Sequence, residues 1–194
     1  MGFSELFLQR HSIIYDYWLN TFWEKVPDDQ FRLRPHSNVN SIAWNIWHIA
    51  RVEDVGLNRF VTDRTQILDE GSWMDKMNLP WRHHGSGMSF ADVDHLDQVI
   101  DLKALRAYSN AVRLCTQDIL SQIDNIDLDA CLQLVHVQKI VIEEGLAHSN
   151  ANKLAENYAG WSKGRCLMTF GLTHSFEHIG EMSVIVSLLG LDLD

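Results

Sequence analysis

The chain has 194 residues, of which 46% are hydrophobic and 22% charged, a composition typical of a folded globular protein and not of a disordered one. Its 16 lysines and arginines against 26 aspartates and glutamates give a formal net charge of −10, which repels the phosphates of nucleic acid. We therefore expect no nucleic-acid partner, and a length of 1–194 predicts a single domain.

The sequence also predicts a soluble, cytoplasmic protein without a membrane partner. No apolar run approaches the roughly 20 residues of a membrane-spanning helix. Glu5 and Arg10 interrupt the region where a signal peptide would be apolar. Cys115, Cys131 and Cys166 are widely spaced and form no paired motif, so we expect buried, reduced thiols instead of disulfides or a zinc-thiolate site.

Four stretches repeat apolar residues every three or four positions, as amphipathic helices do. They span 3–26, which ends before Pro27; 41–62, which Asn40 or Ser41 can cap; 101–123; and 166–190, which ends at a glycine suited to a C-cap. At roughly 20–25 residues each they are matched in length and can share one core. The expected fold is therefore all-α, a four-helix bundle.

Two segments separate these helices. Gly71, Pro80, Gly85 and Gly87 interrupt residues 64–100, which we interpret as a long connection. Because it is long enough to cross the bundle, the second and third helices should run parallel, in an up-down-down-up order. In 127–165, a cluster of β-branched residues at 135–142 predicts a short extended piece, followed by a polar, helical segment at 143–158.

Ten histidines are candidates for chemistry, and His174 and His178 stand four residues apart in a predicted helix. That spacing places both imidazoles on one face, where they can converge on a metal ion. Ten histidines give on the order of 0.5 such pairs by chance, so the spacing alone is weak evidence. Glu181 lies on the same stripe.

A third ligand would have to come from another helix, and His48 is the best candidate. Its stripe on the 41–62 helix contains Trp44, Asn45 and Val52 and should be at least partly buried. A lone inward histidine is more often a hydrogen-bonded core residue than a ligand, so the residues by themselves leave both interpretations open.

Two segments make the sequence recognisable, Trp47–Glu53 in the second helix and His174–Glu181 in the fourth. Together with the helix order, the long connection containing Gly85–Met88 and the Leu105–Tyr108 start of the third helix, they resemble the DinB/YfiT-like superfamily of metal-binding four-helix bundles. In that family one histidine of the second helix and an H-x-x-x-H pair of the fourth bind a divalent metal. The resemblance implies the same role for His48, His174 and His178.

The resemblance also suggests a function. Three imidazoles leave at least one coordination position open and suit zinc, nickel, iron or manganese. Characterised relatives use mycothiol, bacillithiol or glutathione-like thiols in transferase and isomerase reactions. We therefore expect a metal-dependent transferase that activates a low-molecular-weight thiol and acts on a small-molecule substrate. The alternatives are a metal-dependent hydrolase and a stress protein that binds metal or ligand without turnover.

Two residues beside the histidines have open roles. The family often has Arg-Gly-Gln after the last histidine, whereas this chain has Ile179-Gly180-Glu181. Glu181 is thus a candidate fourth ligand, general base or acceptor for a histidine N–H, and equally a surface carboxylate. Trp44 is a candidate wall of a cofactor or substrate pocket, and equally a core residue.

Finally, we expect a homodimer. This inference follows the family and the frequency of symmetric dimers among soluble oligomers. It also rests on Trp73, Met74, Met77 and Trp81, which lie in the long connection without an obvious core to cover.

Overall fold

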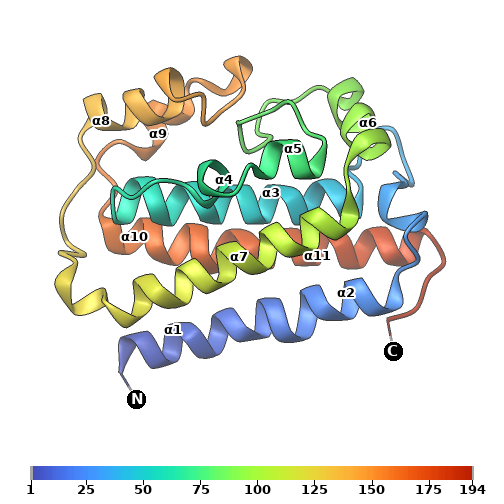
Figure 1. Ribbon diagram of the computed structural model, residues 1–194, viewed down its shortest axis with the longest axis horizontal. Coiled ribbons are helices and arrows are strands. Elements are labelled where there is room, and N and C mark those ends of the chain that lie inside the picture. Colours follow the sequence, from blue (N-terminus) through green and yellow to red (C-terminus); the bar gives the residue numbers. More distant parts are fainter. Residues whose placement is uncertain (1, 194) are drawn as a thin grey trace.

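The computed structural model describes residues 2–193, and every named element among them is helical. Four long helical segments lie side by side (Figure 1). They consist of α1 (Phe3–Ser12), a π-helical turn (Ile13–Leu19) and α2 (Asn20–Lys25); α3 (Ile42–Val55) and a π-helical turn (Gly56–Val61); α7 (Leu102–Ser121); and α10 (Lys163–Met168), a π-helical turn (Thr169–Thr173) and α11 (His174–Leu188). The all-helical prediction is confirmed, and no segment end differs from the predicted one by more than three residues.

The ends of these segments follow from local chemistry. Ser41 begins α3 by accepting a hydrogen bond from the backbone N–H of Trp44 at 2.9 Å, and Asp101 begins α7 in the same way. Gly190 follows α11 with a φ of 71°, the left-handed conformation that glycine adopts at a helix C-terminus without steric cost. None of the described helices is long and apolar enough to cross a membrane.

Paired side chains fix the directions of the helices. The second segment runs parallel to α7, because residues later in one contact residues later in the other: Asp54 contacts Tyr108 and Asn58 contacts Cys115. Just beyond the segment, Arg64 contacts Asp118. The first segment runs opposite to α7, and α11 runs opposite to α3, because their contacts descend: Asp16 with Arg113 and Asn20 with Arg106, then Asn45 with His178 and His48 with His174. Figure 1 shows the same directions.

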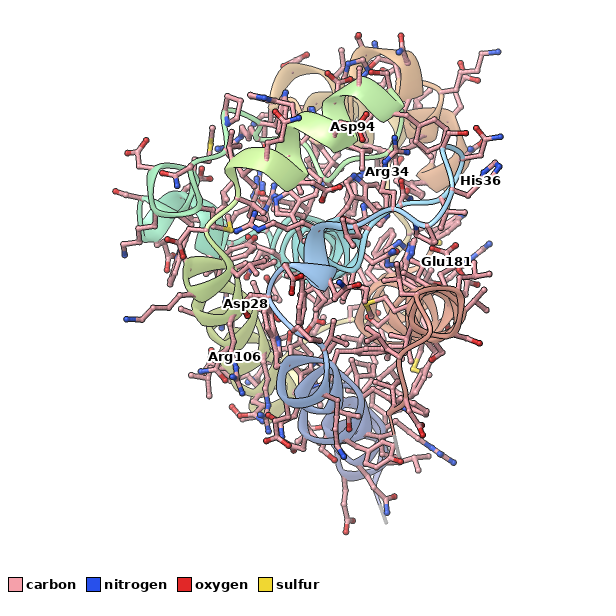
Figure 2. All side chains as sticks on the ribbon, turned by 90° about the vertical axis from the view of Figure 1, so that its right-hand side faces the viewer. Asp28, Arg34, His36, Asp94, Arg106 and Glu181 are labelled. Carbon is pink, nitrogen blue, oxygen red and sulfur yellow. The ribbon has the colours of Figure 1, made fainter. Side chains whose placement is uncertain are left out.

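Helix α3 lies at the centre of the molecule. Viewed along the bundle, it is surrounded by α7, α11 and the first segment (Figure 2). The remaining side is covered by α4 (Ile67–Glu70), α5 (Trp73–Met77) and α6 (Phe90–Val99), which form within the long connection. All residues of Ile42–Val55 are consequently buried, including polar and charged ones, which have to find partners inside.

The segment 127–165 is also helical, so the extended piece predicted near 135–142 is wrong. It contains α8 (Leu134–Gln138), a π-helical turn (Lys139–Glu143), a 3₁₀ turn (Ser149–Ala151) and α9 (Leu154–Tyr158). Val137, Ile140 and Val141 are fully buried, whereas Val135 and Ile142 are exposed. The spacing of the buried residues is that of one helical face, and burying it outweighs the β-propensity of the side chains.

Two smaller expectations also need correction. All three cysteines are free, but Cys166 alone is buried; Cys115 is half-buried and Cys131 is exposed. Cys131 pairs by its backbone with Ser162 at the surface, which leaves its thiol in solvent. The apolar residues of the long connection do have a core to cover: Met77 is fully buried, and Trp73, Met74 and Trp81 pack against the central core.

Candidate metal centre

The structure brings together the three histidines that the sequence singled out. His48 comes from α3, and His174 and His178 come from the first turns of α11. The Nε2 atom of His174 lies 3.1 Å from Nε2 of His48 and 3.2 Å from Nε2 of His178. His48 is buried and the other two are half-buried, and their ligand atoms all lie within 4.8 Å of one another.

This spacing suits a metal ion. Three nitrogens at about 2.0–2.2 Å from one cation lie about 3–3.4 Å from each other, close to the two separations found here. Without a cation, hydrogen bonds alone do not satisfy the three nitrogens. If Nε2 of His174 carries a proton, it can donate it to Nε2 of His48 or to Nε2 of His178, but not fully to both. The donor set therefore fits a divalent ion that accepts three imidazole nitrogens.

The backbone of the long connection fixes the tautomer of His48. Nδ1 of His48 contacts the carbonyl oxygen of His84, and because a carbonyl only accepts, Nδ1 must carry the proton. The lone pair is then left on Nε2, which faces the other histidines. An Nδ1–H donated to a carbonyl is the arrangement that orients metal-binding histidines in proteins.

His178 is oriented in the same manner by two oxygens. Its Nδ1 lies 2.8 Å from Oδ1 of Asn45 and 2.8 Å from Oε2 of Glu181, so it donates and leaves Nε2 free. The hydrogen bond to His178 holds the pKa of Glu181 below its usual value. Glu181 thus contacts the edge of the His178 ring that faces away from His48 and His174. It is not part of the cluster formed by His48, His174 and His178.

His174 differs from the other two. Its Nδ1 is buried and has no hydrogen-bond partner among the described residues. The π-helical turn Thr169–Thr173 ends immediately before it and shifts the helical register at that point. Met168, just before this turn, is 41% exposed, whereas Leu172 within the turn and Ile179 in α11 are buried.

Aromatic rings enclose His48. Trp44 stacks on it, with ring centroids 4.5 Å apart and planes at 21°, and approaches His178 edge-on at 6.1 Å. Trp47 is fully buried in the core. Gly85 closes over both tryptophans with a φ of 102°, and a Cβ there would lie 2.7 Å from the Trp47 ring. Glycine is therefore required where the connection crosses His48.

Burial keeps the imidazoles of His48 and His174 neutral. It lowers the pKa of His48 well below the ordinary value, and the neighbouring His174 and His178 lower it further. Burial is also the main cause that lowers the pKa of His174 to about 3. A neutral imidazole is the form that binds a metal, so these two rings are ready to do so at neutral pH.

A buried charge network anchors the connection that contacts His48. Arg51, on the next turn of α3, is fully buried and paired with Asp54 at 3.0 Å. Its other nitrogen donates to the carbonyl of Arg82 at 2.6 Å, and the backbone N–H of His84 donates to Leu146 at 2.9 Å. The backbone at Arg82 and His84 is therefore fixed by hydrogen bonds to Arg51 and Leu146, and these bonds position the His84 carbonyl that orients His48.

Reasoning from the sequence missed several of these supporting groups. Asn45 is expected from the sequence only to be part of a buried stripe, and no pattern in the long connection singles out His84. The Asn45–His178 contact could have been suspected from the three-residue offset between Asn45 and His48. The His84 contact uses a backbone carbonyl, which no side-chain pattern reveals. His11, which is not one of the grouped histidines, is also buried, and its Nε2 donates to the carboxylate of buried Glu53 at 2.7 Å.

Comparisons with known proteins agree with this fold. The family model of the DinB superfamily matches residues 18–182, a range that includes all three histidines. The chain belongs to the DinB superfamily. It is also similar in structure to a conserved protein from Enterococcus faecalis, with a TM-score of 0.73 and 14% identity over 98% of this chain and 99% of that one. At that identity the likeness shows the fold alone. A search of curated proteins gave no match.

Proposed function

We propose that this protein binds one divalent metal ion at His48, His174 and His178 and uses it to activate a low-molecular-weight thiol, for transfer to or isomerisation of a small-molecule substrate. The observation that carries the proposal is the convergence of three Nε2 atoms, two of them left unprotonated by hydrogen bonds on the opposite ring nitrogen. Zinc, nickel, iron and manganese all accept such nitrogens.

The residues around the proposed metal position have different roles. A divalent ion held here supplies Lewis acidity, which lowers the pKa of a thiol or a water molecule that it binds. His84 and Asn45 fix the ring orientations through the carbonyl and the side-chain amide oxygen. Trp44 covers one face of His48 and shields that side of the centre from water. Glu181 is assigned to orienting His178 and not to coordination.

Hydrolysis is the competing reaction, because the same Lewis acidity acts on water. One assay separates the two. Zinc- and nickel-loaded protein is incubated with glutathione or cysteine and a generic aromatic electrophile, and in parallel with an activated ester without thiol. Thiol-dependent loss of the electrophile supports transfer, thiol-independent ester cleavage supports a hydrolase, and metal binding without either supports a non-catalytic protein. The His174→Ala variant gives the metal-free background in each arm.

The proposal includes a location and an assembly state. A thiol-using protein with three free cysteines suits a reducing compartment, which is consistent with the cytoplasm. A homodimer is kept as part of the proposal on the frequency of symmetric dimers alone, since the apolar residues of the long connection are covered within the chain.

A further inference from the structure

A hollow of about 300 Å³ lies between the Asn38–Asn40 segment and α11. Its α11 wall consists of Glu181, Val184, Ile185 and Leu188. Val184 and Leu188 are each 59% exposed, so the hollow presents apolar side chains to solvent. The volume is within the lower range of small-molecule sites.

The hollow lies further along α11 than the two histidines of that helix, and Glu181 lines it. At 100° per residue, Glu181, Ile185 and Leu188 fall on the same face of α11 as His174 and His178. On the opposite wall, Asn40 comes just before α3, which contributes Asn45 and His48. Glu181 belongs to both places, because it lines the hollow and also accepts a hydrogen bond from His178. Figure 2 shows Glu181 on the side of the molecule where His36 and the start of the Asn38–Asn40 segment lie.

The distance between the two places defines the size of a shared ligand. Ile185 is seven residues beyond His178, which is about 10 Å along a helix axis. A ligand that reaches both the three histidines and the hollow must therefore be elongated. A compact molecule could occupy only one of them.

The lining residues also define the ligand's chemistry. Three of them are aliphatic side chains on α11 and a fourth is Val39, which suits a hydrocarbon tail. The one charged lining residue is Glu181, whose side chain is 55% exposed, and no lysine, arginine or histidine lines the hollow. An anionic tail would therefore be repelled, while an uncharged one would be accepted.

We propose that this hollow is the subsite for the uncharged aliphatic tail of a thiol whose sulfur lies at the three histidines. The inference rests on the proposed function, because it takes the head to be a thiol at the metal centre. It goes further in naming the ligand class, an elongated molecule with a hydrocarbon tail.

The test uses a homologous series of straight-chain alkanethiols on cobalt-loaded protein. Binding is followed by the thiolate-to-cobalt absorption band, which needs no turnover. Short thiols from ethanethiol to butanethiol should bind with similar affinity, since they end before the hollow. Octanethiol and decanethiol should bind more tightly, by about fourfold for each methylene that enters the hollow. A thiol of equal length ending in a carboxylate should lose this gain.

Variants locate the effect. Leu188→Gln should remove most of the chain-length gain while leaving cobalt and ethanethiol binding unchanged. Leu114→Gln is the matched control, because Leu114 is similarly exposed at 56% but lies on α7. It should keep the gain.

The failures are distinguishable. Affinity that does not depend on chain length, or a gain that survives Leu188→Gln, overturns the subsite while the metal-thiol function stands. A carboxylate-ended thiol that binds as well as decanethiol also overturns it. A protein that binds no cobalt, or no thiol of any length, contradicts the proposed function and the subsite with it.

Discussion

At the scale of single residues, the candidate centre depends on groups that do not touch the metal position. His48 is oriented by a backbone carbonyl and His178 by an amide and a carboxylate, whereas Nδ1 of His174 has no partner among the described residues. The three histidines should therefore differ in how their surroundings contribute to metal affinity, although each supplies one nitrogen.

His174→Ala should remove most of the affinity for zinc, at least tenfold, because two imidazoles from different helices remain. The fold should persist, since the side chain is only half-buried and the core stripe through Ile179 and Met182 is untouched. Calorimetric titration with zinc measures the affinity, and circular dichroism checks the helices. His136→Ala, at a half-buried histidine on α8, is the control and should bind zinc like the original chain.

Glu181→Gln should change zinc affinity by less than about tenfold, below the range in which loss of an orienting partner is usually felt. The amide oxygen can still accept from His178, and Asn45 remains at 2.8 Å on the same nitrogen. The same titration measures the change. A loss comparable to that of His174→Ala would mean that Glu181 coordinates the metal directly.

Asp97 should make stability depend on pH. Burial raises its pKa from 3.8 to about 7, while Ser41, which caps α3, donates to it at 2.5 Å. Between these two values the folded chain holds a proton that the unfolded chain releases, so the free energy of unfolding falls as pH rises from about 4 to about 7. Asp97→Asn removes this dependence. The stability of the original chain relative to Asp97→Asn, from urea denaturation, should therefore be greater at pH about 5 than at about 8; an equal difference at both would contradict the assignment.

At the scale of elements, close contacts between the second and fourth segments depend on glycine. Gly56 begins the π-helical turn after α3, and a Cβ there would lie 2.4 Å from Cβ of Phe170 on the fourth segment. Gly180, in the middle of α11, has open space around the same position. Replacement by alanine should therefore have opposite effects on stability at Gly56 and at Gly180.

Gly56→Ala should lower the free energy of unfolding by about 1–3 kcal/mol, because the methyl group overpacks the interface with Phe170. Gly180→Ala should raise it by about 0.5–1 kcal/mol, through the better helix propensity of alanine. Urea denaturation of both variants measures the changes. Stabilisation by Gly56→Ala would show that the two segments are not packed as closely as described.

The long helical segments were easier to predict from the sequence than the π-helical turns and the short helices. The four long segments have regular apolar periods and could be located within three residues. The π-helical turns could not be located, because a spacing of three or four residues between apolar positions does not distinguish such a turn from the α-helix around it. The helix at Leu134–Gln138 was mistaken for extended chain because its β-branched residues were weighed by propensity and not by the spacing of the buried ones.

The candidate site was predictable to a similar degree. His48, His174 and His178 could be found from spacing and a family resemblance, since side-chain identity carries that signal. The groups that orient them could not, because the carbonyl of His84 belongs to a connection without periodicity and its position depends on buried Arg51.

At the scale of the whole molecule, the proposed homodimer should give a mass twice that of the 22.4 kDa chain in light scattering at micromolar concentration. The formal charge of −10 opposes association of like chains, so the dimer should be favoured by added salt if its interface is apolar. A monomeric mass at both low and high salt would contradict the proposal.

The central claim, that the three histidines hold one divalent metal ion, is tested most directly by X-ray absorption spectroscopy of the zinc-loaded protein at one equivalent per chain. We predict a coordination shell of about three imidazole nitrogens at about 2.0–2.1 Å, with the outer-shell scattering of the histidine rings. A shell made only of oxygen, one with sulfur from the chain's cysteines, or failure to take up one equivalent of zinc would contradict the account.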